Sequence, residues 1–392
     1  MGKLFQLCVY EPCDYFELLP VVHVRPVFDL TLGVKTLLDR ICSYYPEVPV
    51  SLFCRDSLQS LMSEVHPHKR INQLDRFLPT VFLAGGLVLD ISIFTQLGVD
   101  HLETDTIFSL NGQIVGAYLC SSVSKLEFEA LLRTGFQGLP VVTLTQGLYV
   151  SKLWDLVALN LRVLNSDLDG SGVYREANVK VEEFVFFNTE KGPIYLSEGV
   201  FVEAGSRLEG PLFVGPYTQI LGGKIKTSTI GAYCKVSGEV SESVISSYSN
   251  KAHAGFLGNS YIGEWVNLGA GTTTSNLKNT YGEISLIIRG ESVKTGLQFL
   301  GSIFADYVKT GIGTLLNAGT VIGLGSSIWG SVLHDKDIPD FSWGESGVYG
   351  EIRGEKMLEI AQKMMARRNQ ILSPAKQLVI ENLYVKKDES HG

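Results

Sequence analysis

Paired cysteines and basic runs are both missing from this sequence of 392 residues. Its six cysteines stand singly among apolar neighbours and form no CxxC pair: Cys8, Cys13, Cys42, Cys54, Cys120 and Cys234. We therefore expect neither a zinc site nor a disulfide framework, and we expect most of the six to be small buried side chains in a reducing compartment.

Lysine and arginine number 33 against 41 aspartates and glutamates, a formal charge of −8. No basic run precedes the C-terminal helical segment, so the chain lacks the basic face that binding to nucleic acid requires.

Long apolar runs are missing as well. No stretch reaches the roughly 18 apolar residues that a membrane span needs, and the start, MGKLFQLCVYEPCDYF, has no charged segment followed by a long apolar block. We expect a cytoplasmic protein that has no membrane partner. With 45% hydrophobic residues, the chain is long enough for two domains that each bury a core.

Residues 1–165 alternate between strand and helix patterns. The predicted strands are 4–9, 48–54 and 80–84, and the predicted helices are 32–45 and 125–133. This alternation favours a Rossmann-like α/β domain, in which helices cover a mostly parallel sheet. The polar stretch NSDLDGSG near Asn165 then indicates a linker, and we place the linker and a first strand at 166–190.

A six-residue period of aliphatic residues begins after Lys191. It runs through one main track and a second track: Leu196, Val202, Leu208, Val214 and Ile220, then Ile194, Val200 and Leu212. The period slips at Gly222-Gly223, resumes, and returns near the end of the region as Leu300, Asp306, Ile312, Ala318 and Leu324. Hexads of this kind predict a parallel β-helix over 191–340, with one hexad on each of three faces.

The period breaks between Thr273 and Gly290, and a loop that leaves a regular solenoid usually has a function. Residues 341–392 follow as a C-terminal helical segment, in which a methionine-rich stripe over 355–371 is typical of packing. Arg367 and Arg368 form a basic patch on that segment. They fit either a solvated helix face or contact with an anionic ligand.

One histidine stands out at the start of the hexads around residue 260. His253 is surrounded by Ala252, Ala254 and Gly255, so little side-chain bulk crowds its ring. An imidazole titrates near neutrality and can accept a proton from an attacking amine or hydroxyl. The alternative interpretation is a buried, hydrogen-bonded histidine at a solenoid corner.

The stretch around His253 resembles the acetyltransferase half of the bifunctional N-acetylglucosamine-1-phosphate uridyltransferase/glucosamine-1-phosphate acetyltransferase family. The resemblance covers Lys-Ala-His, Phe-Leu-Gly and VNLGAGT within 251–276. It implies a left-handed coil, acetyl-CoA as donor, an amino sugar phosphate as acceptor, and a homotrimer whose subunits share each site. The period break at 273–290 would help to enclose the donor.

The same resemblance implies roles for individual residues. His253 takes the position of the general base, and Phe256 replaces the tyrosine that touches the sugar phosphate in the family. Lys251 and Asn267 are expected to bind the acceptor, although Asn267 also fits a ladder asparagine of the coil. The remaining matched positions are expected to meet acetyl-CoA: Ala270, Asn276, Ser302 and Ala318. An N–H or the Ser302 hydroxyl could stabilise the oxyanion of the thioester, while small residues such as Ser302 and Ala318 also suit tight corners.

The N-terminal domain resembles the sugar nucleotidyltransferase fold in the stretch that contains Arg25-Pro26, Asp29 and Gly33. Arg25 could hold a phosphate weakly or simply stabilise the fold. Nucleotidyl transfer also needs a glycine-rich phosphate loop and carboxylates for magnesium. The sequence has Glu-Pro-Cys-Asp at 11–14 and Gly85-Gly86 at these two positions. Magnesium is therefore expected only if substitute ligands exist, and Asp14, Asp90 and Asp105 are the candidates.

Three functions follow from these patterns. The first is an acetyl-CoA-dependent N-acetyltransferase that acts on an amino sugar phosphate and carries a degenerate nucleotidyltransferase domain. The second is an active sugar-1-phosphate nucleotidyltransferase, which the missing loop and carboxylate disfavour. The third is a non-catalytic trimer that binds sugar nucleotides, an alternative that Phe256 keeps open.

Overall fold

The computed structural model describes residues 4–75 and 77–389, which divide into two compact units. The first unit falls within Met1–Leu18, Val24–Leu30 and Lys35–Ser151, and the second within Leu19–His23, Thr31–Val34 and Lys152–Gly392. Two short N-terminal segments therefore belong to the second unit.

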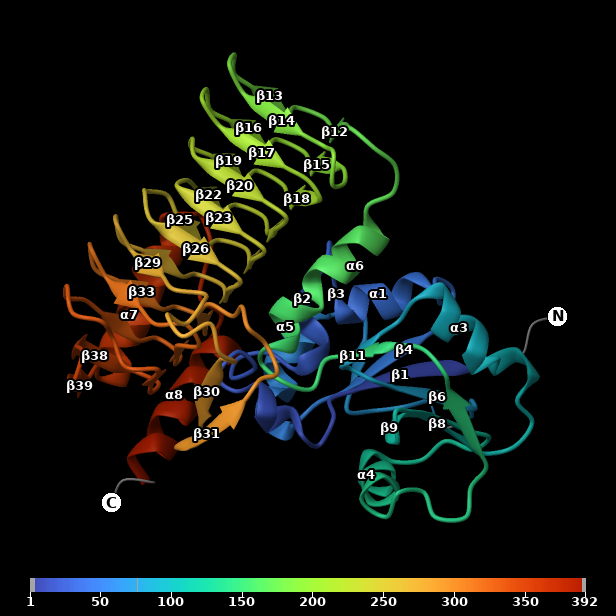
Figure 1. Ribbon diagram of the computed structural model, residues 1–392. Coiled ribbons are helices and arrows are strands. Elements are labelled where there is room, and N and C mark those ends of the chain that lie inside the picture. The colour runs from blue at the N-terminus through green and yellow to red at the C-terminus, as the bar shows by residue number, and fades with distance from the viewer. Residues whose placement is uncertain (1–3, 76, 390–392) are drawn as a thin grey trace. The chain divides into compact units, whose positions relative to one another are not determined.

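The first unit is built on a seven-stranded mixed sheet (Figure 1). In spatial order its strands are β10 (Val141–Leu144), β8 (Thr106–Leu110), β9 (Gln113–Leu119), β6 (Thr80–Ala84), β1 (Gln6–Tyr10), β4 (Val50–Phe53) and β5 (Arg70–Ile71). β6, β1, β4 and β5 are parallel, whereas β9 runs antiparallel to both β6 and β8. The Rossmann-like α/β prediction is confirmed, and β9 is its antiparallel exception.

Four α-helices accompany this sheet: α1 (Leu37–Ser43), α2 (Gln59–Val65), α3 (Ile91–Leu97) and α4 (Lys125–Arg133). Helix α4 has the predicted bounds because a capping box between Ser124 and Glu127 fixes its start. Helix α1 is shorter than the predicted 32–45, since Thr36 caps it through the Asp39 N–H and the preceding residues form two short strands, β2 (Thr31–Leu32) and β3 (Lys35–Thr36). Stacking of Phe128 on Phe82, with ring centroids 3.9 Å apart, packs α4 against the sheet.

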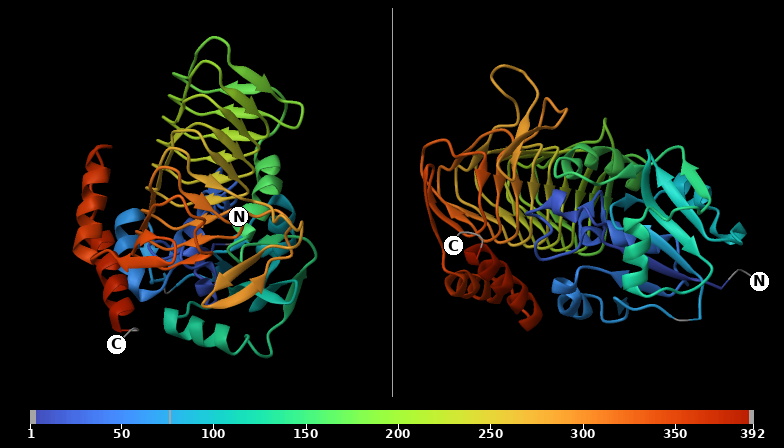
Figure 2. Two further views of the ribbon diagram at one scale, coloured as in Figure 1. Left: turned by 60° about the vertical axis from the view of Figure 1, so that its left-hand side comes forward. Right: turned by 90° about the horizontal axis from the view of Figure 1, so that it is seen from below.

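The second unit begins with helices α5 (Asp155–Ala158) and α6 (Asn160–Asp167) and continues as a three-sided, left-handed parallel β-helix (Figure 2). Its first face contains β12 (Val173–Arg175), β15 (Ile194–Leu196), β18 (Leu212–Val214), β21 (Thr229–Ile230), β24 (Val244–Ile245), β27 (Tyr261–Ile262), β32 (Ile303–Phe304), β35 (Val321–Ile322) and β37 (Asp337–Ile338). The second contains β13 (Lys180–Val181), β16 (Phe201–Val202), β19 (Gln219–Ile220), β22 (Lys235–Val236), β25 (Asn250–Lys251), β28 (Asn267–Leu268), β33 (Lys309–Thr310), β36 (Ser327–Ile328), β38 (Ser342–Glu345) and β39 (Val348–Glu351). The third contains β14 (Phe186–Asn188), β17 (Arg207–Glu209), β20 (Lys224–Lys226), β23 (Glu239–Ser241) and β26 (Phe256–Gly258), with β29 (Thr273–Thr274) and β34 (Leu315–Leu316) paired beyond it.

The coils begin before the expected boundary at Lys191. β12, β13 and β14 form a complete coil that pairs with the next one, so a coil lies within the segment that we expected to be linker and first strand. This coil is poor in the Leu/Ile-Gly hexads that marked the later ones, and its side chains are more exposed. Helix α6 also extends into the NSDLDGSG stretch as far as Asp167.

The interior of the solenoid confirms the first hexad track and corrects the last one. Leu196, Val202 and Leu208 are fully buried, as an inward-facing track requires. In the later coils, Ile312 is 80% exposed, whereas Phe304 and Ile322 fill the interior. The predicted period of six is present, and four members of the predicted track are buried: Leu300, Asp306, Ala318 and Leu324. These positions belong to the turns, however, and the strand residues that fill the core lie two positions earlier in each hexad, as at Leu316 and Ile322.

The slip at Gly222-Gly223 is a change in coil length. Val214 pairs with Ile230, and Ile230 with Ile245, so these coils are shorter than the regular spacing of three hexads. At the tightened corner, a Cβ on Gly223 would lie 2.1 Å from the Gly238 carbonyl oxygen. The predicted break after residue 273 is also present: the chain leaves the coil and forms the hairpin β30 (Ser285–Ile288) and β31 (Glu291–Lys294).

The C-terminal segment is helical after β39, in α7 (Gly354–Ala366) and α8 (Pro374–Glu389). Buried Met357 and Met365 confirm that the methionine stripe packs. Arg368 is not simply solvated, because its guanidinium donates to the Tyr233 carbonyl (3.1 Å) and to Asn250 Oδ1 (2.9 Å) and so fastens the end of α7 to the solenoid. Among the described residues, no helix has both the length and the apolar character needed to cross a membrane.

All six cysteines are free. The expectation of buried positions holds for Cys8, Cys54 and Cys234, whereas Cys13 and Cys120 are exposed.

Candidate functional site

His253 lies at the corner between β25 and β26, and its ring is exposed. Among the described residues the ring has no hydrogen-bond partner, so the alternative of a buried, bonded histidine is wrong. Gly255 makes this corner possible: its φ is +126°, and a Cβ there would lie 2.1 Å from the Thr272 carbonyl oxygen. The corner therefore presents an imidazole with free nitrogens above a backbone too close-packed for larger residues.

Lys251 occupies an inward-facing position of the solenoid, where Val236 stands on the previous coil. It is only 2% exposed, and its ammonium donates to the backbone carbonyls of Ser237 (3.3 Å) and His253. Burial lowers the pKa of Lys251 to about 8. The expected contact with the acceptor is therefore not available to this side chain, which instead holds the backbone of His253.

The next coils place further predicted residues around the same corner. The Gly271 N–H donates to the Ala254 carbonyl (3.0 Å), so Ala270 lies in the corner directly beside that of His253. Asn267 is exposed on the neighbouring second face. Its Oδ1 accepts from Asn250 Nδ2 (3.3 Å), so it is a ladder asparagine as well as an accessible one.

Phe256 follows this corner on the third face, and Asn276 lies at the far end of that face, at the corner that leads into the first face. A Cβ on Gly258 would lie 2.4 Å from Phe256 Cζ and 2.9 Å from Asn276 Nδ2, so both side chains lie over that glycine. Asn276 Nδ2 donates to Asn259 Oδ1 (2.7 Å), which fixes its amide. The third face thus carries an aromatic ring next to the His253 corner and a fixed amide at its far end, while Asn267 lies on the second face.

Ser302 and Ala318 lie at a different corner, the one that leads into the first face. Ser302 is fully buried in a ladder: its N–H donates to Ser260 Oγ (3.0 Å) and its hydroxyl to the Asn317 carbonyl (3.5 Å). Ala318 is buried too. Within one chain, the Ser302 hydroxyl does not face a ligand at the His253 corner, because it closes the turn of its own coil.

The second predicted site, at the carboxyl ends of β1 and β4, is occupied by an ion pair. The Glu11 carboxylate is buried and accepts from the Arg55 guanidinium and from the Arg55 backbone N–H (3.2 Å). The guanidinium also lies over the Tyr15 ring, 4.6 Å from its centroid. Burial raises the pKa of Glu11, and Arg55 opposes this rise. A cavity of about 240 Å³ remains beside the pair, lined in part by Cys13 and Lys125.

Arg55 was missed in the sequence, although a charged residue directly after the predicted strand 48–54 was a usable signal. Its partner Glu11 stands where a phosphate loop would follow β1. A phosphate there would meet a carboxylate, and the nearest guanidinium is already paired. Arg25, the predicted phosphate ligand, is only 9% exposed, and its carbonyl accepts from Arg55 Nη2 (3.4 Å).

The residues of this edge do not fit magnesium. At Gly85 and Gly86 a Cβ would lie 2.9 Å from Phe28 Cβ and 2.5 Å from the Val150 carbonyl oxygen, so neither position tolerates a carboxylate. Asp90 caps α3 through the Ile93 N–H (2.8 Å), and Asp105 accepts from the Cys120 N–H (2.7 Å). In residues 4–75 and 77–389 no group of three or more His, Cys, Asp and Glu side chains could hold a metal ion.

Comparison with known proteins agrees with this two-part architecture. The model of the sugar nucleotidyl transferase family matches residues 7–171. Over 202 residues the chain is 28% identical to the bifunctional sugar-1-phosphate nucleotidylyltransferase/acetyltransferase of Sulfurisphaera tokodaii. This matched region covers 48% of this chain and 46% of the relative. Over 204 residues it is 30% identical to the bifunctional protein GlmU of Methanocaldococcus jannaschii, at 48% and 45% coverage.

The chain thus resembles these bifunctional proteins over about half of its length, and its residues 7–171 match the sugar nucleotidyl transferase family. Its matches span about half the length of these curated relatives. Among solved structures, it is 15% identical to AntD, an N-acyltransferase from Bacillus cereus, with 50% of this chain and 92% of that chain covered. The TM-score is 0.25, which is too low to inform the fold.

Proposed function

We propose that this protein is an acyl-CoA-dependent N-acyltransferase, with acetyl-CoA as the donor and an amino sugar phosphate of the glucosamine 1-phosphate type as the acceptor. The observation that carries the proposal is the exposed His253 ring, which has no partner among the described residues and stands above a corner of alanine and glycine. The GlmU-like relatives support the class of substrate. The product would then serve the synthesis of UDP-N-acetylglucosamine in the cytoplasm.

In this reaction the amine nitrogen of the acceptor attacks the thioester carbonyl. His253 accepts the proton that the nitrogen loses, and the tetrahedral intermediate collapses as the C–S bond breaks. The imidazolium then returns its proton to the leaving CoA thiolate, so charge and protons balance. Because the His253 carbonyl is held by Lys251, the imidazole is attached to an ordered backbone.

The accessible residues around the His253 corner are proposed to bind the acceptor and the acyl donor. Asn267 offers an amide to the acceptor sugar, and the Phe256 ring offers an apolar surface without the hydroxyl that the resembled family supplies. Ala270 and Asn276 border the path of the acyl donor. Ser302 and Ala318 lie at another corner and would reach this site only from a neighbouring subunit. For that reason we propose a homotrimer with sites between adjacent solenoids.

The N-terminal domain, in this proposal, does not transfer nucleotides. Positioning and charge neutralisation supply nearly all the catalysis of phosphoryl transfer. At this edge the Glu11 carboxylate opposes a phosphate, and no described carboxylates gather to bind magnesium. The domain keeps the nucleotidyltransferase fold without its catalytic site and has a structural role.

The proposal is tested by measuring release of free CoA thiol from acetyl-CoA with a panel of amino sugar phosphates. Glucosamine 1-phosphate is expected to be the best acceptor, and light scattering is expected to show a trimer. Absence of thiol release with every amino sugar phosphate would favour a non-catalytic sugar-nucleotide-binding protein instead.

A further inference from the structure

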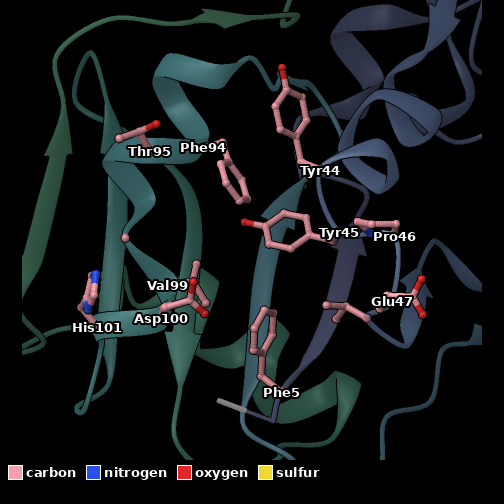
Figure 3. A pocket seen from close by; sticks show the side chains of 12 residues that line it. Phe5, Tyr44, Tyr45, Pro46, Glu47, Phe94, Thr95, Val99, Asp100 and His101 are labelled. Carbon is pink, nitrogen blue, oxygen red and sulfur yellow. The ribbon is translucent and has the colours of Figure 1, made fainter. Parts of the chain in front are cut away.

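A second cavity in the first unit lies at the opposite edge of the sheet from Glu11 and Arg55. It has a volume of about 470 Å³ and is bordered by Phe5, just before β1, by residues 44–48 between α1 and β4, and by residues 94–101 of α3 and the turn after it (Figure 3). Ligands of open α/β sheets usually bind at the carboxyl ends of strands. This cavity is at the amino ends of β1 and β4, so neither the acyltransferase proposal nor the nucleotidyltransferase fold accounts for it.

Four aromatic rings form the wall of the cavity. Tyr45 packs edge-on against Phe5 and Phe94, with ring centroids 6.1 Å and 5.3 Å apart, and Tyr44 lies 5.3 Å from Phe94. The rings therefore support one another around an open space, as in sites that receive a flat ring or an organic cation.

The Tyr45 hydroxyl is the polar group inside this wall. Tyr45 is 5% exposed, and its buried hydroxyl has no hydrogen-bond partner. Figure 3 shows the hydroxyl directed into the space between Phe94 and Asp100. A buried hydroxyl without a partner is less stable than a bonded one, and a ligand that bonds to it would remove this cost.

The lining carries two carboxylates and one imidazole, that of the exposed His101. Glu47 and Asp100 are exposed carboxylates, and the lining contains no lysine or arginine. Asp100 is close enough to Tyr45 to contribute, after burial, to raising the pKa of its phenol. A phosphate or carboxylate ligand would be repelled here, and a positive charge would be attracted.

We propose that this cavity binds a small organic cation in which an aromatic ring carries an ammonium group on a short chain. The ring lies among Phe5, Tyr45 and Phe94. The ammonium group donates to the Tyr45 oxygen and to the Asp100 carboxylate, and the aromatic faces add cation–π attraction. The site is independent of His253.

The test uses the full-length protein and isothermal titration calorimetry with three probes of similar shape: phenethylamine, 2-phenylethanol and 3-phenylpropionate. The amine is expected to bind at least about tenfold more tightly than the alcohol, because only the amine pairs with Asp100, and the carboxylate is expected not to bind. Asp100→Asn should weaken amine binding by about tenfold. The matched control, Glu103→Gln, removes the same charge from an exposed residue outside the lining and should leave binding unchanged.

A second variant separates the hydroxyl from the fold. Tyr45→Phe keeps the ring packing and should weaken binding of the amine while the melting temperature remains within a few degrees of the wild type. Equal affinity for the amine and the alcohol, no detectable binding of the amine, or an unchanged amine affinity in Asp100→Asn would each overturn the proposal.

Discussion

The His253 corner is the predicted catalytic site, the Glu11–Arg55 edge stands where the resembled nucleotidyltransferase fold would have its own, and the two differ in what their charged or titratable groups already bind. The His253 ring is exposed and makes no hydrogen bond among the described residues. The Glu11 carboxylate is buried, and a guanidinium and a backbone N–H of Arg55 bind it. The His253 ring keeps both nitrogens available to a ligand, whereas the Glu11 carboxylate and the Arg55 guanidinium neutralise each other, so the first region retains a capacity for chemistry that the second has lost.

The largest expected effect is at the open corner. His253→Ala should lower the rate of acyl transfer by on the order of 10²-fold or more, the usual range for a positioned general base. Because the side chain is exposed, the melting temperature should stay nearly unchanged. Kinetics and melting curves measured on the same preparation check both statements, and unchanged turnover would remove His253 from the mechanism.

A substitution at the Glu11–Arg55 edge should change the stability of the protein rather than its activity. Glu11→Ala leaves the mostly buried Arg55 without its carboxylate, and we expect a loss of about 3 kcal/mol in the free energy of unfolding. Chemical denaturation measures this loss. The control Glu103→Gln changes an exposed carboxylate and should alter stability by less than about 0.5 kcal/mol. A stability of Glu11→Ala equal to that of the wild type would show that the ion pair is not what closes this edge.

The smallest effect is expected at Lys251, which connects the core of the solenoid to the catalytic corner. Burial lowers the pKa of Lys251 to about 8 in the folded protein, whereas an unfolded lysine titrates near about 10.4. Between these values the unfolded chain binds more protons, so stability attributable to Lys251 should rise with pH. The two carbonyls that accept from the ammonium favour its charged form and hold its pKa nearer the unfolded value, so we expect a gain of only about 1 kcal/mol between pH 8 and 10.5.

Lys251→Met keeps the apolar stem and removes the titration. The wild type should gain stability relative to this variant across the same pH window, as urea denaturation would show. A constant difference between the two proteins at pH 7, 8 and 10 would mean that the pKa of Lys251 is the same in the folded and unfolded states.

The sequence was sufficient for the architecture because period and composition are local properties. The hexad from Leu196 to Ile220 identified the inward track, and helical spacing over 125–133 identified α4, whose start the structure shows to be capped by Ser124. Phase was harder to predict, since Ile312 and Phe304 both belong to series of six and only the coil geometry shows that Ile312 faces outward.

Side-chain environment at the sites was the part that the sequence could not provide. Lys251 and Ser302 matched a ligand-binding pattern, but pairing with Val236 and Ser260 on the previous coils places both in the interior. The Glu11–Arg55 pair joins residues 44 positions apart and depends on β1 and β4 being neighbours. Such contacts depend on which strands and coils are neighbours in the fold, and a short sequence motif carries no information about these neighbours.

One measurement tests the contrast between the two regions most directly. The purified full-length protein is incubated with glucosamine 1-phosphate, acetyl-CoA, UTP and magnesium, and free CoA thiol and pyrophosphate are assayed in the same reaction. We predict thiol release that disappears in His253→Ala, with no pyrophosphate above background in either protein. Robust pyrophosphate release without thiol release would contradict the account, because it would place the chemistry at the edge that Glu11 and Arg55 occupy.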